Sequence, residues 1–252
     1  MGKVGSRTVY ESLKRAGLSN PIFHIHFLSD DITEYRHIHV RAGGQNPYHL
    51  DLGEAIGREV KKATGKRCKL ISLVRDPIAV RVSDLFQNPD FASATILSES
   101  GVIDPVKATE YLRNRLADPD AFDYVFNWFD REVKRMFSID VFAQPFPREK
   151  GYAVLHGEVA DLLVLRLEDF DKVGPDAVRQ FLQQDKSFEY VSANVRAGTS
   201  EAVTYDLVRR NLKLEHALCE RVYSSKFVTH FYDAAEINGF IDAWVLKVRP
   251  HH

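Results

Sequence analysis

The sequence is poor in cysteine and has no long run of apolar residues. Its 252 residues include two cysteines, Cys68 and Cys219, which form no CxxC or zinc-binding pattern. Two isolated thiols predict no disulfide framework, so a reduced cytosol is the expected compartment. No apolar stretch approaches the roughly 20 residues needed to span a bilayer, and no signal peptide opens the chain. We therefore expect a cytoplasmic protein without an integral membrane segment.

An excess of charge of one sign is also missing. The chain has 34 Lys and Arg residues against 35 Asp and Glu residues, which gives a formal net charge of −1. This near-neutral charge gives the whole molecule no electrostatic attraction to nucleic acid or to a membrane surface. Internal repeats are absent as well. With 44% hydrophobic residues, the composition fits one ordinary globular domain with a sizeable core.

A glycine-rich loop opens the chain and leads into a helical pattern. Gly2 and Gly5 permit a tight turn, and Ser6 or Thr8 can cap the helix that follows. Apolar residues at helical spacing indicate this helix, namely Val9, Leu13 and Ala16. Backbone N–H groups at a helix start, together with Lys3, suit an anion such as a nucleotide phosphate. The order of residues is not that of a Walker A motif, and a simple capped helix is the alternative.

A second candidate phosphate element follows residues 69–74, a short apolar run typical of a buried parallel strand. Arg75 stands at the end of this run, Asp76 is a good N-cap, and Pro77 fits the first position of a helix. Ser83 lies about two helical turns after Asp76 and shares a face with the cap. An arginine and a serine placed in this way can bind one phosphate from two sides.

These two elements resemble the cofactor site of sulfotransferases that use 3′-phosphoadenosine 5′-phosphosulfate (PAPS). Their 5′-phosphosulfate-binding loop is similar to the residues Lys3, Val4, Gly5, Ser6, Arg7 and Thr8. The segment Arg75-Asp76-Pro77, with Ser83, resembles their 3′-phosphate-binding strand and helix. The resemblance implies that Lys3 reaches the transferring sulfate and that Arg75 and Ser83 bind the 3′-phosphate. The chain looks most like a bacterial branch of sulfotransferases and capsular polysaccharide biosynthesis proteins.

Two further stretches extend the resemblance. Arg196 and Gly198 match the loop that closes over the 3′-phosphate in sulfotransferases, although Ala197 replaces a usual lysine and a plain loop is equally compatible. Residues 163–170 resemble a strand followed by an acidic turn, in which Leu167 replaces a tyrosine. We interpret this second stretch as structural.

Two histidines provide candidates for a general base. Residues 21–28 alternate as a strand would, which puts His24 and His26 on one face. The His-x-His pattern resembles that of uronyl 2-O-sulfotransferases, and this resemblance favours His26 as the base, with His24 as its neighbour. The alternative is a structural pair of hydrogen-bonded histidines. His37 and His39 form a second such pair, but no acidic or cysteine ligand completes a metal-binding spacing, so we expect no metal.

The rest of the chain predicts an α/β fold, a P-loop-like parallel sheet flanked by helices with further helical additions. Helices are expected at residues 48–64, after Asp76, after Asp104, through an apolar stripe at 122–137, after Gly174 and from residue 200 onward. Residues 152–156 and 162–167 are expected to form a strand pair across Gly157. Trp128, Arg131 and Arg135 lie off the stripe, facing either a substrate or solvent.

The sequence thus predicts one sulfotransferase-like domain over residues 1–252, with the strand that normally precedes the phosphate loop missing before residue 1. The expected activity is transfer of a sulfuryl group from PAPS to a hydroxyl of a carbohydrate acceptor in polysaccharide biosynthesis. The alternative is a non-catalytic module of the same fold that binds a nucleotide or a glycan. A nucleotide-dependent kinase is disfavoured, because neither a Walker A lysine nor a Walker B acid is evident. The oligomeric state stays open.

Overall fold

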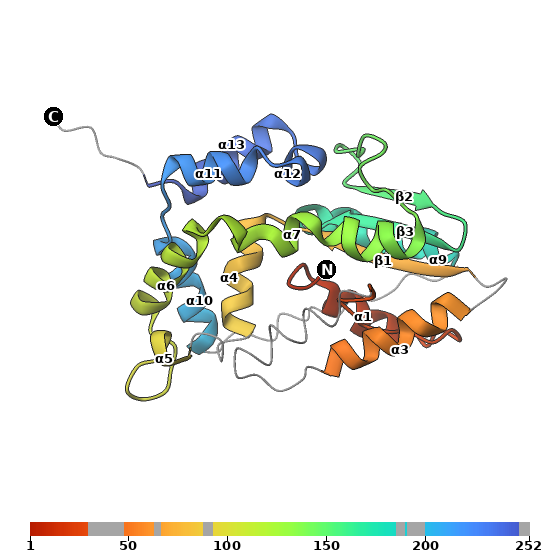
Figure 1. Cartoon of the computed structure of the whole chain (residues 1–252), viewed down its shortest axis with the longest axis horizontal. Helices are drawn as coiled ribbons and strands as arrows, with labels where there is room; N and C mark the ends of the chain where they lie inside the picture. Colours follow the sequence, from red (N-terminus) through yellow and green to blue (C-terminus); the bar gives the residue numbers. More distant parts are fainter. Residues whose placement is uncertain (30–47, 63–66, 88–92, 185–189, 191–199, 247–252) are drawn as a thin grey trace. The chain divides into compact units, whose positions relative to one another are not determined.

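The computed structural model describes residues 1–29, 48–62, 67–87, 93–184, 190 and 200–246. The chain divides into two compact units, each made of two separate stretches of sequence. Unit 1 consists of residues 1–75 and 127–195, and unit 2 consists of residues 76–126 and 196–252. Figure 1 shows the elements of both units coloured along the chain.

The sheet of unit 1 is mixed and has three strands in the order β1-β3-β2 among the described residues. Figure 1 shows β1 (Cys68–Val74), β3 (Ala160–Arg166) and β2 (Tyr152–His156) side by side. β1 and β3 are parallel as predicted, but β2 and β3 are antiparallel, so the sheet is mixed where a parallel sheet was expected. The correction follows from the short turn at Gly157, because parallel neighbours need a crossover of a dozen or more residues.

Helices α1 (Ser6–Arg15) and α3 (Tyr48–Lys62) confirm the first two predicted helices. Among the described residues, α1 has no side-chain cap, because Gly5 holds the N-cap position and Ser6 is already helical, so the prediction of a Ser6 or Thr8 cap was wrong. Gly17, with φ of 66°, ends the helix as expected.

The segment at residues 21–29, which we call the histidine segment, does not form the predicted strand. Its backbone groups bond to side chains instead of to a neighbouring strand. The amides of Leu28 and Ser29 donate to the carboxylate of Glu132, and the carbonyl of His26 accepts from the indole of Trp128. Phe27 and Leu28 are buried together, which breaks the alternation that a half-buried strand would show.

The apolar stripe at residues 122–137 is helical in several pieces. A 3-10 turn (Pro119–Phe122) leads into α7 (Asp123–Trp128), a π-helical stretch (Phe129–Lys134) and α8 (Arg135–Phe137). Most of the stripe is buried as predicted, with Phe126 and Met136 half-buried. Trp128 is also buried, with only 6% of its surface exposed, so its expected place on a substrate or solvent face was wrong. The i→i+5 hydrogen bonds of the π-helical stretch change the side-chain directions after Trp128, a change that a 3.6-residue pattern does not predict.

Helix α9 (Phe170–Leu182) packs against β3 and β2. It begins before Gly174, so the predicted start at that glycine was wrong, and Pro175 lies inside the helix. The preceding turn (Leu167–Asp169) carries an ion pair between Arg166 and Asp169, in line with the structural interpretation of this stretch.

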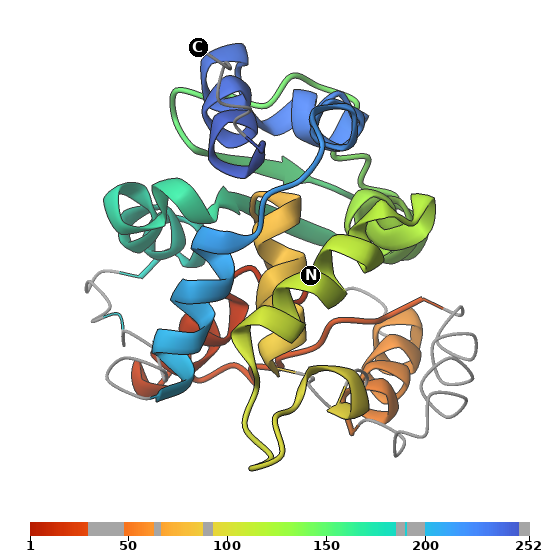
Figure 2. The same cartoon turned by 90° about the vertical axis from the view of Figure 1, so that its left-hand side faces the viewer.

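Unit 2 is helical. Figure 2 shows α10 (Ser200–Asn211) beside α4 (Pro77–Gln87) and α6 (Pro105–Ala117). The remaining helices are α5 (Ser93–Ile96), α11 (His216–Tyr223), α12 (Lys226–Phe231) and α13 (Ala234–Trp244). Asp104 caps α6 by accepting from the amides of Val106 and Lys107, which confirms that helix and its start.

Asp76 organises the core of unit 2 from the start of α4. Its carboxylate accepts hydrogen bonds from the amide of Ile78, the hydroxyl of Tyr223 and the indole of Trp244. The predicted capping residue therefore also binds side chains of α11 and α13. Among the described residues, no helix is long and apolar enough to cross a membrane.

Candidate functional site

The loop before α1 has an unusual backbone. Lys3 and Gly5 both have positive φ, at 64° and 84°. A non-glycine residue in this region is uncommon and costs roughly 1–3 kcal/mol, and such residues cluster at functional sites. Left-handed residues directly before a helix belong to the backbone geometry in which N–H groups bind anions.

Tight packing on unit 1 fixes this loop. The side chain of Val4 is completely buried. A Cβ atom on Gly5 would lie 2.7 Å from Cδ1 of Leu167, so the turn after β3 leaves room only for glycine at this position. Leu167, which stands where the resemblance expects a tyrosine, therefore supports the loop before α1 through packing.

Arg75 and the loop are in contact. The guanidinium of Arg75, at the end of β1, donates a long hydrogen bond of 3.4 Å to the carbonyl oxygen of Lys3. The two elements that sequence reasoning selected separately, 72 residues apart, are thus neighbours in unit 1. Both side chains are half-buried.

The other residues of the loop motif have different surroundings. Arg7 is exposed, and its guanidinium lies 3.9 Å from the carboxylate of Glu11. The amide of Thr8 donates to the carbonyl of Gly5 at 3.0 Å and closes the first turn of α1. Ser6 contacts the histidine segment: its hydroxyl lies 3.0 Å from Nε2 of His24.

The two candidate bases lie next to each other. The ring of His24 stacks on Tyr10 of α1 at 5.4 Å between centroids, and the ring of His26 meets His24 edge-on at 4.7 Å. The structure thus brings His24 directly to the start of α1, and His26 lies beside it. The role of a general base for His26, with His24 as its neighbour, stays a prediction.

Sequence reasoning missed Glu132, which holds the histidine segment from the π-helical stretch. Its side chain is fully buried, and its carboxylate accepts from the amides of Leu28 and Ser29 and from the Ser29 hydroxyl. Burial raises the pKa of this carboxyl group above its usual value, although the hydrogen bonds from Leu28 and Ser29 act in the opposite direction. The signal in the sequence that could have identified Glu132 is its position within an aromatic stripe that was expected to be buried.

Among the remaining predicted site residues, only Ser83 belongs to the part of the chain that the structure describes. Ser83 is buried in α4, and its hydroxyl lies 3.3 Å from that of Tyr205 in α10. Arg196, Gly198, His37 and His39 lie outside the described residues. The described part of the chain contains no group of three or more metal-ligating side chains.

Comparisons with known proteins give one family. The family model described as "NKWYS: Putative capsular polysaccharide synthesis protein" matches residues 103–233, more than half of the 252-residue chain. No curated protein matches the chain, and no solved structure matches it. The matched segment includes α6, the buried helical stripe with Glu132, and strands β2 and β3. The chain therefore belongs to the NKWYS family, whose description assigns it to capsular polysaccharide synthesis.

Proposed function

We propose that this protein transfers a sulfuryl group from PAPS to a hydroxyl of a carbohydrate in capsular polysaccharide synthesis. One observation carries the proposal: the positive-φ loop at Lys3 and Gly5 stands at the start of α1, and Arg75 donates a hydrogen bond to that loop. The family description supports the polysaccharide context. The sulfotransferase assignment itself rests on the motif resemblance.

The loop supplies positively polarised groups that transfer of a sulfuryl group requires. Backbone N–H groups at a helix start attract a phosphate or a sulfate through their partial positive charge. The ammonium group of Lys3 adds a full charge near the bridging oxygen, where negative charge grows as the leaving nucleotide departs. Arg75 adds a planar donor suited to a second phosphate. Ser83 stays a sequence-based prediction for the same phosphate.

The proposed step balances without a metal ion. The acceptor hydroxyl oxygen forms a new bond to sulfur, while the bond from sulfur to the 5′-phosphate oxygen breaks. The bonding electrons leave with 3′,5′-ADP, and the hydroxyl proton passes to a histidine. We assign this proton transfer to the pair His24 and His26, because His24 reaches Ser6 and His26 adjoins His24.

The test is transfer of labelled sulfate from PAPS to capsular polysaccharide fragments. Lys3→Gln removes the charge but keeps a polar side chain that is one bond shorter, and we expect kcat to fall by about 10²–10³-fold. Lys14→Gln, on the exposed face at the other end of α1, is the matched control and should keep full activity. Nucleotide binding without any transfer would indicate the non-catalytic module instead, and equal activity of both variants would exclude a role for Lys3.

A further inference from the structure

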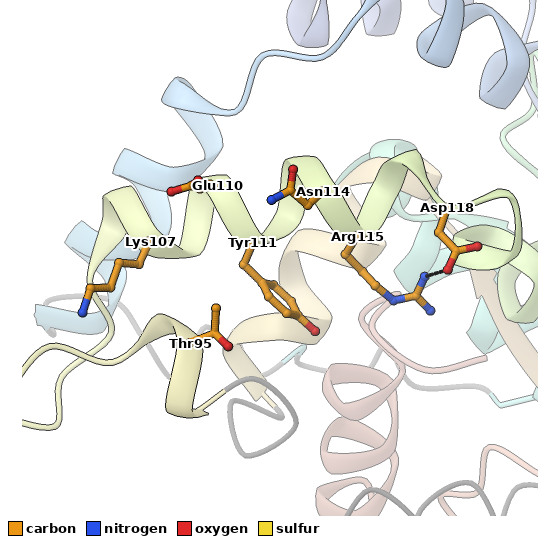
Figure 3. A pocket seen from close by; sticks show the side chains of 7 residues that line it. All are labelled: Thr95, Lys107, Glu110, Tyr111, Asn114, Arg115 and Asp118. Carbon is orange, nitrogen blue, oxygen red and sulfur yellow. Dashed lines mark hydrogen bonds and ion pairs between the residues drawn. The ribbon is translucent and has the colours of Figure 1, made fainter.

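A groove runs along α6 in unit 2, in a stretch of sequence separate from the loop at Lys3. Its cavity volume is about 480 Å³, within the range of roughly 300–1,000 Å³ that is common for small-molecule sites. One side is formed by Thr95 of α5. The other is formed by Lys107, Glu110, Tyr111, Asn114, Arg115 and Asp118. Figure 3 shows these side chains along the helix, with Lys107, Tyr111 and Arg115 in one row.

The pattern of α6 explains why these side chains line one groove. The lining positions on the helix are separated alternately by three residues and by one, which places them on one stripe of a helix. The opposite stripe, with Ala108, Leu112 and Leu116, is buried in unit 2. The helix is thus fixed through its apolar face while it presents a polar, aromatic-containing face to the groove.

The far side of the groove is also fixed. Leu97, directly after α5, forms an antiparallel bridge with Ile103, directly before the Asp104 cap. The amide of Asp104 donates to the carbonyl of Ile96 at 2.9 Å. The ammonium group of Lys107 donates to the carbonyl of Leu97 at 3.0 Å. These three contacts hold Thr95 of α5 at a set position over α6.

The chemistry of the lining favours a neutral, hydroxyl-rich ligand. Two cations face two anions, and one pair is already formed, since Arg115 lies 3.0 Å from Asp118. Charges that cancel in this way give little attraction for a phosphate or a polyanion. Within the described part of the chain, the side chains of Glu110, Tyr111 and Asn114 make no hydrogen bond, so their donors and acceptors remain available.

The half-buried ring of Tyr111 supplies the apolar surface that such a ligand also needs. A pyranose has hydroxyls at its edge and an apolar face formed by its C–H groups. A tyrosine ring can cover that face, and amide and carboxylate groups beside it can bind the hydroxyls. Together, Glu110, Tyr111 and Asn114 offer both kinds of contact over about one turn of α6.

We infer that this groove binds neutral sugar units of a polysaccharide and serves as a subsite for the acceptor chain. The inference rests on the proposed function for the role of the sugar as acceptor. The binding itself depends only on the groove. The groove lies within the family-matched segment, and on this inference α6 contributes to the choice of saccharide.

The experiment measures direct binding of an array of neutral hexopyranose oligosaccharides of two to six units by ligand-observed NMR and titration. Heparin, as a polyanion, is tested in parallel. At least one neutral oligosaccharide should bind more tightly than heparin, and Tyr111→Ala and Asn114→Ala should each weaken that binding by about tenfold or more. Val106→Ala is the matched control, since Val106 lies on the same helix, is 73% exposed and does not line the groove.

The same variants are titrated with 3′,5′-ADP, so that the two proposals can fail separately. Loss of saccharide binding in Tyr111→Ala, with unchanged nucleotide binding and an unchanged unfolding midpoint, would support the groove as a sugar site. If no oligosaccharide binds, or if binding survives both substitutions, the groove is only a solvated helix face and the inference is wrong. Saccharide binding without any nucleotide binding would keep the groove and overturn the sulfotransferase proposal.

Discussion

The indole N–H of Trp128 donates a 2.8 Å hydrogen bond to the carbonyl oxygen of His26, which lies 102 residues earlier in the chain. One helical turn further on, Glu132 accepts hydrogen bonds from Leu28 and Ser29. The helical run thus binds the backbone on both sides of Phe27. The positions of the two histidine rings therefore depend on this helix and not on strand pairing.

Replacing Trp128 with phenylalanine tests this dependence. Trp128→Phe removes the part-buried hydrogen bond from the indole to the carbonyl of His26, which should cost about 0.5–1.5 kcal/mol of unfolding free energy. The chemical shifts and titration of the His24 and His26 ring protons should also change, because the segment that carries them loses one attachment. Urea unfolding and NMR titration of the histidines measure the two effects.

Trp244→Phe is the matched control for that substitution. It breaks a buried indole hydrogen bond to Asp76 of equal length, 2.8 Å, and should lower stability by a similar or larger amount because the acceptor is charged. The histidine titrations should be the same as in the unmodified protein. If both variants leave them unchanged, Trp128 does not position the histidines.

Glu132 should be among the least replaceable residues of unit 1. Glu132→Ala leaves the buried amides of Leu28 and Ser29 without an acceptor, and we expect a loss of about 2–5 kcal/mol in unfolding free energy. Glu132→Gln keeps one carbonyl acceptor and should cost less. Equal midpoints of denaturant unfolding for the two variants would contradict the role of the carboxylate as the shared acceptor.

Two helical glycines should respond to alanine in opposite directions. A Cβ on Gly57 of α3 would lie 2.9 Å from the carbonyl oxygen of Leu28, a backbone atom that cannot move aside without shifting the histidine segment. Gly57→Ala should destabilise the protein by about 1–3 kcal/mol. Nothing lies within 4 Å of the same position at Gly239 of α13, so Gly239→Ala should stabilise by about 0.5–1 kcal/mol. Thermal unfolding of both variants gives the signs, and a stabilising Gly57→Ala would rule out the close approach.

The two thiols should differ in reactivity. Burial, and secondarily the nearby Asp76, raises the pKa of Cys219 to about 11, whereas Cys68 is half-buried. The folded pKa lies above the unfolded value of 9.0, so the stabilisation from this thiol is complete below about pH 9 and is lost as the pH rises toward 11.

At pH 8, iodoacetamide should modify Cys68 and spare Cys219 until urea unfolds the chain, as peptide mass spectrometry can measure. Equal labelling rates in the folded protein would show that Cys219 is not buried.

Local patterns predicted a large part of the fold. The strand at 69–74, the cap at Asp104, the helix stop at Gly17 and the hairpin across Gly157 are confirmed, because each is set by residues within a few positions of one another. The Arg75 motif and the Lys3 loop were found separately from sequence, and the structure brings them into contact.

Hydrogen bonds between side chains and a distant part of the backbone explain why the strand predicted at residues 21–28 was wrong. The histidine segment has the alternation of a strand, but its backbone groups form hydrogen bonds with Glu132 and Trp128 instead of with a neighbouring strand. A single sequence gives no signal that residues about a hundred positions apart will pair. The apolar spacing also gives no signal for the π-helical stretch that follows Trp128, because it assumes 3.6 residues per turn.

We propose that the loop at Lys3 and the end of β1 at Arg75 form a nucleotide phosphate site. Calorimetric titration with 3′,5′-ADP and with 5′-AMP measures this, since the two ligands differ only in the 3′-phosphate. We predict that the unmodified protein binds 3′,5′-ADP about 10- to 100-fold more tightly and that Arg75→Ala removes most of this preference, as loss of a charged hydrogen bond should. Equal affinity of the unmodified protein for both nucleotides would contradict the claim.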